Sequence, residues 1–209
     1  MRITLVRHAE SEANSLNMYG SQTDTGLTDR GRRQCAFLAQ QRDRFDGARI
    51  IASDLARATE TLRLVLGSAV DATLEQVWRE RDFGGAAGMT ADAARARYPA
   101  LFDFEGGGWF AAKTEDGESL ADVDRRVRVA LEEIVARDDS HVAVFTHGGP
   151  IQLSICAVLG LDPRTHMRRF NVENTAIATL QSSPWGVVVT GWNEVSHLPS
   201  AERTGVFEA

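Results

Sequence analysis

The amino-acid sequence predicts a three-layer α/β/α fold with a central, mostly parallel sheet. Short runs rich in β-branched residues alternate with longer segments whose apolar residues recur at helical spacing, and this alternation favours a sheet with helices on both faces. Two of the runs, residues 2–6 and 141–146, are each followed closely by a histidine. An irregular stretch, residues 84–118, interrupts the alternation, and we expect it to be a helical and loop excursion that covers a site at one end of the sheet.

The first half of the chain contains three predicted strands and two predicted helices. Residues 2–6 form a buried first strand, and residues 48–52 form a second one. A helix is expected over residues 28–45, because a threonine opens it and an Asp-Gly pair follows it. The next helix follows residues 53–54, Ser-Asp, whose short polar side chains are typical helix N-caps. A third strand is expected over residues 74–77.

The second half of the chain continues the alternation after the excursion. Its longest predicted helix, residues 119–137, has apolar residues spaced along one face. Residues 199–209 are polar, and we expect them to form a mobile tail. The elements expected in order are a helix at 91–98, a helix at 119–137, a strand at 141–146, a helix at 151–159, and two strands at 175–181 and 187–192 joined by a turn.

Composition limits the classes of protein to which the chain can belong. With 43% hydrophobic and 25% charged residues, the 209 residues suit a folded protein, and we expect one domain over residues 1–209. The net charge of −6 disfavours nucleic acid and anionic membranes as partners. Cys35 and Cys156 show neither a disulfide framework nor zinc-ligand spacing. No apolar run approaches the ~18 residues of a membrane span, so we expect a cytoplasmic protein.

Unusual residues follow three of the predicted strands. Arg7 and His8 follow the first strand, Ser53 and Arg57 come after the second, and His147 with two glycines follows the strand at 141–146. Ligands of α/β sheets bind at the carboxyl ends of the strands. Two imidazoles and two guanidiniums brought together there would repel one another, and a dianionic phosphoryl group between them removes that repulsion. The pattern therefore predicts a phosphate-binding pocket.

Each of these residues also has an ordinary structural interpretation. Arg57 is spaced to form a helix-surface ion pair with Asp54 or Glu60. His147 precedes two glycines and fits a turn, and Glu80 lies among other charged residues, as on a solvated surface. Taken one at a time, the residues leave both interpretations open.

Six segments of the chain resemble motifs of the histidine phosphatase superfamily, which includes the cofactor-dependent phosphoglycerate mutases. Residues 5–14 are similar to R-H-G-E followed by an asparagine, and residues 53–61 are similar to S-D-L-x-R-A-x-x-T. The resemblance spans roughly residues 3–180, and the motifs occur in the order of the family. The other segments are 26–34, 80–84, 117–119 and 146–149, which resemble L-T-x-x-G-x-x-Q, E-x-x-F-G, G-E-S and T-H-G-G.

The resemblance implies a phosphoglycerate mutase-like fold and a metal-independent phosphatase that hydrolyses a small phosphomonoester without a cofactor. It makes His8 the nucleophile that forms a phosphohistidine, and Glu80 the proton donor to the leaving oxygen. These residue types suit the task, because a neutral imidazole attacks phosphorus readily and arginines stabilise the charge on phosphoryl oxygens. The resemblance assigns phosphate binding to Arg7, Asn14, Arg57 and His147.

The chain departs from the family pattern at one position, and another region bears on which branch of the family it resembles. Ala9 stands where the family usually has glycine, a change that fits a backbone with φ below zero. Residues 84–92 are similar to the short form of this region in phosphatases, whereas mutases carry a longer basic segment there. The resemblance therefore favours a phosphatase. Phosphoglycerate mutase-type phosphoryl transfer is the first alternative, and a catalytically inactive protein that binds a phosphorylated ligand is the second.

The expected partner is a small phosphorylated metabolite, such as a sugar phosphate, a glycerate derivative or the ester of a small alcohol. Aromatic residues in segment 89–118 either line the substrate entrance or pack against the core, and the sequence leaves both open. Lys113, Arg95 and Arg97 are candidates for one additional contact to the substrate. A homodimer formed through an edge strand is compatible with a chain of this size.

Overall fold

The computed structural model describes residues 1–205, and its strands form one mixed sheet in the order β3-β2-β4-β1-β5-β6. The four strands from β3 to β1 run parallel, whereas β5 is antiparallel to β1 and β6 is antiparallel to β5. The mostly parallel sheet predicted from the sequence is thus confirmed. The strands are β1 (Arg2–Arg7), β2 (Arg49–Ala52), β3 (Ala72–Leu74), β4 (His141–Thr146), β5 (Ile177–Ser183) and β6 (Gly186–Glu194).

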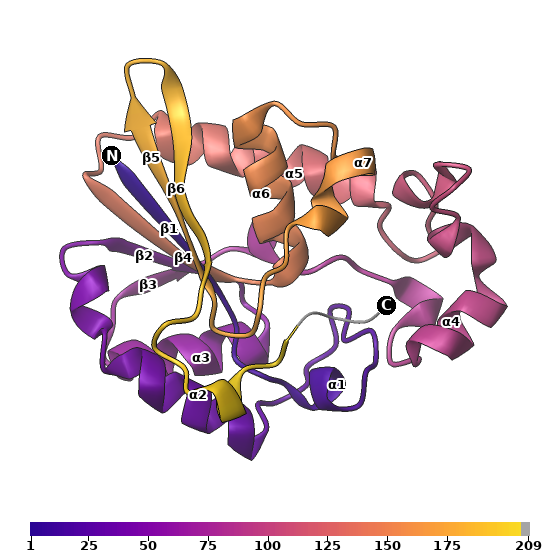
Figure 1. Cartoon of the computed structure of the whole chain (residues 1–209), viewed down its shortest axis with the longest axis horizontal. Helices are drawn as coiled ribbons and strands as arrows, with labels where there is room; N and C mark the ends of the chain where they lie inside the picture. The colour runs from indigo at the N-terminus through magenta and orange to yellow at the C-terminus, as the bar shows by residue number, and fades with distance from the viewer. Residues whose placement is uncertain (206–209) are drawn as a thin grey trace.

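Helices cover both faces of the sheet and complete the three predicted layers (Figure 1). α2 (Asp29–Ala39) and α3 (Ala56–Leu66) pack together on one face, and α5 (Leu120–Val135) and α6 (Gly148–Leu159) pack together on the other. The remaining helical segments are α1 (Glu12–Ser15), α4 (Ala91–Arg97), α7 (Pro163–His166) and 3₁₀ turns at Arg42–Phe45, Gln76–Trp78, Gly84–Ala86, Pro99–Phe102, Gly108–Phe110, Met167–Arg169 and Ser200–Glu202.

The alternation of side chains along the central strands divides the core into two layers. In β1, Ile3 and Leu5 join the cluster formed with α5 and α6, whereas Val6 joins the cluster formed with α2 and α3. In β4, Val144 belongs to the first cluster and Phe145 to the second. Burial of a side chain such as Leu5 stabilises the fold by about 1.5–3 kcal/mol. Since both faces of the sheet are covered, nearly every residue of β1 and all of β4 are buried, the polar ones included.

Polar side chains cap two of the long helices. Thr28 caps α2, and Ser119 caps α5 with a reciprocal capping box. The expected cap at residues 53–54 is wrong, because Leu55 occupies the N-cap position of α3 without a side-chain hydrogen bond. The Ser53 hydroxyl instead contacts the ring of His147 at 2.8 Å.

Two element boundaries also differ from the prediction. The helix expected over 28–45 ends at Ala39, because the chain turns there and brings the Phe45 ring to 5.5 Å from that of Phe145. The third strand begins and ends earlier than predicted, since its backbone pairs with β2 over Ala72–Leu74. The chain then turns at Trp78, whose side chain is fully buried.

The excursion predicted over residues 84–118 is held together at its base. A side chain at Gly84, where φ is +50°, would collide with Thr114. A Cβ atom at Gly117 would lie 2.9 Å from the carbonyl oxygen of Asp82, and the backbone N–H of Glu118 donates to that same oxygen at 2.8 Å. Two glycines thus allow the ends of the excursion to meet, and α4 lies beyond the layers of the sheet (Figure 1).

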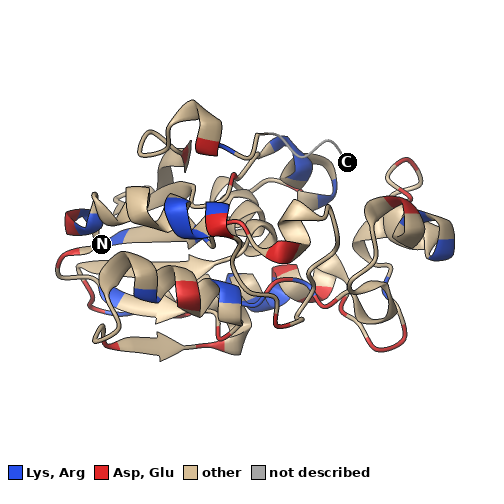
Figure 2. Ribbon diagram, turned by 90° about the horizontal axis from the view of Figure 1, so that it is seen from below, with Lys and Arg blue, Asp and Glu red and all other residues tan. Residues whose placement is uncertain are grey.

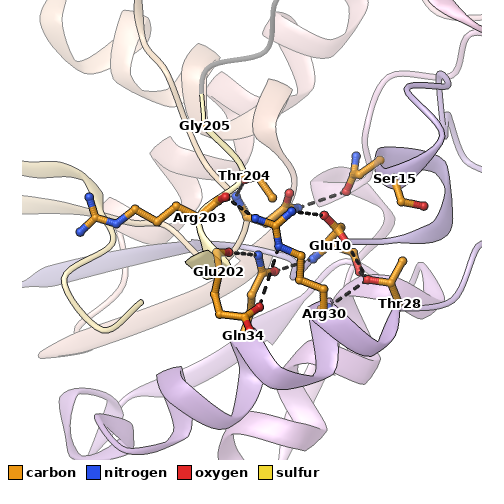
Figure 3. Close-up of polar contacts among 12 residues, drawn as sticks. Glu10, Ser15, Thr28, Arg30, Gln34, Glu202, Arg203, Thr204 and Gly205 are labelled. Atoms are coloured by element: carbon orange, nitrogen blue, oxygen red, sulfur yellow. Dashed lines mark hydrogen bonds and ion pairs between the residues drawn. The ribbon is translucent and has the colours of Figure 1, made fainter. Parts of the chain in front are cut away.

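Residues 200–205 belong to the tail that the sequence predicts to be mobile, and in the structure they contact other segments. Figure 3 shows them lying against α2 and against the loop that follows β1. The Gln34 side chain, for example, donates to the Glu202 carbonyl at 2.8 Å. Polar contacts join this segment to residues that lie far away in the sequence. A local sequence pattern therefore gives no sign of them. The last four residues, 206–209, lie outside the described residues.

The surface carries charges of both signs. Figure 2 shows Lys and Arg positions mixed with Asp and Glu positions along the elements in view. Within residues 1–205, no helix combines the length and the apolarity that crossing a membrane requires.

Candidate active site

The two predicted pocket histidines lie side by side where β1 and β4 end. The register of these parallel strands pairs Arg7 with Thr146, so the residues that follow, His8 and His147, are also neighbours. The backbone N–H of His8 donates to the Thr146 carbonyl at 2.9 Å, and the two rings are 5.1 Å apart between centroids. Parallel pairing of two distant strands therefore creates the centre of the site.

Arg57 reaches the same place from the first turn of α3. Its Nε donates to Nδ1 of His147 at 3.2 Å, and its two terminal nitrogens donate to the carbonyl oxygens of Thr23 at 3.0 Å and Ser21 at 2.7 Å. The alternative of a helix-surface ion pair is wrong, because Arg57 is 2% exposed. The acidic candidates have other partners: Asp54 pairs with Arg79, and Glu60 pairs with Arg32.

Arg7 is buried at the end of β1 with its guanidinium at the start of α6. A Cβ atom at Gly148 would lie 3.6 Å from Nε of Arg7, and Nη1 of Arg7 donates to the Val172 carbonyl at 2.5 Å. Burial, with a smaller effect from the positive charge of Arg57, lowers the pKa of Arg7 to about 10, while Glu80 opposes the shift. The group therefore remains a cation at neutral pH, in a place where an anion would stabilise it.

The His8 ring is held as a neutral imidazole with one nitrogen available. Nδ1 lies 2.7 Å from the carbonyl oxygen of Ala9, which only accepts, so Nδ1 carries the proton and Nε2 keeps its lone pair. Burial, followed by the charges of Arg57 and Arg7, lowers the pKa of His8 well below 6.5. The backbone φ of Ala9 is not positive, as we expect for an alanine that stands where the family usually has glycine.

The His147 ring is also neutral, and both of its nitrogens have partners. Since Nε of Arg57 only donates, Nδ1 of His147 accepts, and Nε2 carries the proton that it donates to the Ser53 hydroxyl at 2.8 Å. Burial and the Arg57 charge lower the pKa of His147 well below 6.5. His147 is the N-cap of α6, which begins at Gly148 and not at residue 151 as predicted. The glycines therefore place helix N–H groups beside the site.

Glu80 enters the site from the segment after β3. One carboxylate oxygen accepts from the backbone N–H of Gly149 at 3.2 Å, and the other accepts from that of Arg81 at 2.9 Å. A side chain at Gly149 would collide with this carboxylate. The alternative of a solvated charge run is wrong for Arg81, which is 3% exposed and donates to the carbonyl oxygens of Glu118 and Ala112.

The structure brings the six predicted site residues to one end of the sheet. Arg57 donates to His147, and the ring of His147 lies next to that of His8. Glu80 and Arg7 lie close by at the N-terminus of α6. Asn14 in α1 is linked to the His8 carbonyl through one further side chain, that of Asn174. The catalytic and phosphate-binding roles themselves stay predictions.

Sequence reasoning assigned no role to several residues that the structure places at the site. Ser53 contacts His147, Asn174 contacts the His8 carbonyl, and Gln22 donates to the Glu80 carbonyl at 3.1 Å. Ser21 adopts φ of +51°, which directs its carbonyl to the arginine described above. Ser53 lies within the motif at 53–61 and could have been found there, whereas the others have no local sequence signal.

The aromatic residues near the excursion divide between the two interpretations left open. Trp109 is buried in the main core with α5. Tyr19 instead stacks on Phe83 at 4.5 Å and lies 5.6 Å from Phe102, in a separate cluster next to the loop that contacts the site. The basic candidates are engaged locally: Lys113 is 3.8 Å from Asp122, and the guanidiniums of Arg95 and Arg97 lie over the rings of Phe102 and Tyr98.

A sequence model of the histidine phosphatase superfamily (branch 1) matches residues 3–195. The chain belongs to this superfamily. Phosphoserine phosphatase 1 from Hydrogenobacter thermophilus is 30% identical over 200 residues, covering 95% of this chain and 94% of the relative. "Probable phosphoglycerate mutase GpmB" from Enterobacter sp. is 29% identical, with 95% of each chain covered. A solved phosphoserine phosphatase mutant from Entamoeba histolytica in complex with phosphoserine gives a TM-score of 0.84 at 26% identity, covering 95% of this chain and 99% of that chain.

Four buried histidines predict that this histidine phosphatase loses stability in mild acid. Burial lowers the pKa of His8 and His147 well below 6.5, and that of His141 and His197 to about 4. As pH falls below 6.5, the unfolded chain binds protons that the folded chain excludes, so unfolding is favoured. Each such histidine lowers the free energy of unfolding by about 1.4 kcal/mol per pH unit in this window.

Urea denaturation measured at pH 7.5, 6.5, 5.5 and 4.5 checks this dependence. We expect stability to be fully present above pH 6.5 and to fall progressively below it. His141→Gln is the comparison variant, because it removes one of the four histidines. His141 lies at the start of β4 and contacts Thr4 and Arg2, and its removal should reduce the slope of stability against pH. Constant stability from pH 7.5 to 5.5 would contradict the neutral, buried state of these rings.

Proposed function

We propose that this histidine phosphatase hydrolyses a small phosphomonoester through a phosphohistidine on His8, without a metal ion. The observation that supports the proposal most directly is the hydrogen bond from Nδ1 of His8 to the Ala9 carbonyl. It leaves Nε2 of a neutral ring as a nucleophile, next to the guanidiniums of Arg7 and Arg57, whose charges match the phosphoryl oxygens.

The reaction has two steps in this proposal. Nε2 of His8 attacks phosphorus, the bond between phosphorus and the ester oxygen breaks, and Glu80 gives its proton to that leaving oxygen. A water molecule then attacks phosphorus, returns a proton to Glu80 and breaks the P–N bond. The arginines and the N–H groups at the start of α6 stabilise the charge on the phosphoryl oxygens in both steps.

The substrate class is proposed from the surroundings of the site and from its relatives. Tyr19, Phe83 and Phe102 form an aromatic cluster beside the loop at residues 20–23, which suits the organic part of a small ester better than a second phosphate. Some relatives are named phosphoserine phosphatase, and others are named probable phosphoglycerate mutase. Phosphoserine and phosphoglycerate are therefore the first compounds to test.

Phosphoryl transfer between two organic acceptors is the second candidate, favoured by the 29% identical relatives named probable phosphoglycerate mutase. The outcome depends on whether water or a second substrate molecule reaches the phosphohistidine. The basic side chains of the excursion, including Lys113 and Arg97, have local partners, so they offer little to retain a charged intermediate. We therefore place hydrolysis first, and a protein that binds without turnover last.

We expect a panel of phosphorylated metabolites, assayed in EDTA, to reveal rapid phosphate release from at least one compound. The panel includes phosphoserine, 3-phosphoglycerate, a sugar phosphate and glycerol phosphate, each with and without a bisphosphoglycerate primer. Hydrolysis predicts release without primer, and vanadate should inhibit it by occupying the phosphoryl site. Isomerised phosphoglycerate that appears only with primer would favour the mutase, and a loss of activity in EDTA would contradict the metal-independent route.

A further inference from the structure

The carboxamide of Asn174 lies between the backbone of the proposed nucleophile and the side chain of Asn14. Its Nδ2 donates to the carbonyl oxygen of His8 at 3.0 Å and to Oδ1 of Asn14 at 3.1 Å. Asn174 comes from the segment just before β5, far from both partners in sequence, and its side chain is fully buried. One amide group thus joins three parts of the site.

The orientation of this amide follows from its neighbours. Reversing it would place Oδ1 of Asn174 against the His8 carbonyl and against Oδ1 of Asn14, so that three acceptors would meet. In the observed orientation, Oδ1 of Asn174 is buried without a hydrogen-bond partner in the described part of the chain. An unpaired buried acceptor is unfavourable. Nδ2 of Asn174 therefore keeps both of its acceptors, whereas Oδ1 of Asn174 has no donor in the described part of the chain.

The backbone next to Asn174 is strained in a way that aims this side chain. Thr175 has φ of +59°, a left-handed conformation that is rare for a β-branched residue. Its hydroxyl donates to the Asn174 carbonyl at 2.7 Å and contacts Nε2 of His197 at 3.0 Å, and its N–H donates to the His8 carbonyl at 3.3 Å. Such strain persists where surrounding contacts fix it, and it is concentrated at functional sites.

These contacts settle how the Asn14 carboxamide is turned. Its Oδ1 accepts from the N–H of Ser11 at 3.2 Å, from the Ser11 hydroxyl at 3.2 Å and from Asn174 at 3.1 Å. Three donors on one oxygen leave the opposite atom, Nδ2, as the group that is free to act. Across residues 1–205 this Nδ2 makes no hydrogen bond, and Asn14 is only half-buried.

We propose that Asn174 is a positioning residue that holds the Nδ2 donor of Asn14 ready for a phosphoryl oxygen and fixes this donor relative to His8. The inference rests on the proposed function, because it assumes that a phosphoryl group binds beside His8. It adds a requirement to that function: Nδ2 of Asn14 can donate to the phosphoryl oxygen only while the buried Asn174 carboxamide bonds to Oδ1 of Asn14. Asn174 itself touches no substrate and acts through Asn14.

Calorimetric binding of inorganic phosphate to the whole protein tests this coupling without requiring turnover. We expect Asn14→Ala to weaken phosphate binding by about tenfold, the effect of one hydrogen bond to a charged group, and Asn174→Ala to weaken it by a similar factor. Because both variants remove the same contact, the double variant should lose no more than Asn14→Ala alone. If Asn174 acted on the site independently of Asn14, the loss of affinity in the double variant would instead be the product of the two single losses.

Two further variants keep the test decisive. Thr204→Val removes the acceptor of the Asn174 backbone N–H but leaves the carboxamide contacts intact, so phosphate affinity should stay within about twofold of the parent. Asn174→Ser keeps a polar group that is too short to reach Asn14, and it serves if the alanine variant does not fold. Multiplicative losses, or full affinity in both Asn174 variants, would overturn the inference alone. Absence of phosphate binding by the parent would overturn the proposed function with it.

Discussion

Replacing His8 with alanine is expected to slow phosphate release by at least about 10³-fold, because the covalent route disappears with its nucleophile. Nε2 of His8 is the ring nitrogen left with a lone pair once Nδ1 is bonded to Ala9. Arg57 and His147 keep their mutual contact without it, so the phosphate site itself should persist. Steady-state phosphate release and calorimetric phosphate binding, measured on the same preparation, separate the two effects.

The matched control for this variant is His166→Ala. His166 lies in α7, and its ring contacts the Thr165 hydroxyl and the Asp162 carbonyl, away from the site. Its removal should leave the rate within about twofold of the parent. If His8→Ala retained activity within tenfold of the parent, water would be the direct nucleophile and the assignment of His8 would be wrong.

Replacing Glu80 with glutamine is expected to slow alkyl phosphates by about 10²–10³-fold, the usual contribution of a general acid. The same change should affect p-nitrophenyl phosphate less than tenfold, since p-nitrophenolate leaves with little protonation. Glutamine keeps the shape of the side chain and one acceptor oxygen, although one contact to the N–H of Gly149 or Arg81 is lost. The ratio of kcat values for the two ester classes is the quantity to measure.

Glu75→Gln removes the same charge from the same segment of chain and provides the control for that ratio. Glu75 bonds β2 only through its backbone N–H, which donates to the Ala52 carbonyl at 2.8 Å, so the substitution keeps this contact. The ratio should remain that of the parent. Equal losses on both ester classes in Glu80→Gln would show that Glu80 orders the site without donating the proton.

The parts of the fold and site that the sequence predicted are those encoded by local pattern. Apolar runs gave β1 and β4, and parallel pairing of two such strands brings the residues after them together. The sequence alone therefore predicts that His8 and His147 lie close together. Arg57 and Glu80 lie in short segments, 53–61 and 80–84, that resemble motifs of the family, so the family resemblance located them as well.

The parts that the sequence did not predict depend on contacts between distant segments. Asn174 is an ordinary asparagine before a strand, and only the fold brings it to the His8 carbonyl. Ser53 has the residue type of a helix cap, but its hydroxyl is taken by His147, and tertiary structure overrides the local preference. The contacts of the segment at 200–205 have no local signal either, because its partners lie on α2: Arg33 pairs with the Glu202 carboxylate, and the Gln34 side chain donates to the Glu202 carbonyl.

The pairing of Arg7 with Thr146 has a consequence for how the protein acquires activity. Because side chains alternate between the faces of a sheet, a slip of one residue between β1 and β4 would carry one histidine past the other and turn neighbouring side chains to the wrong layer. If the proposed mechanism holds, a chain with all its helices formed but with these two strands misaligned would have no activity. Under that mechanism, turnover after dilution from denaturant should return only once the middle of the sheet has its correct alignment.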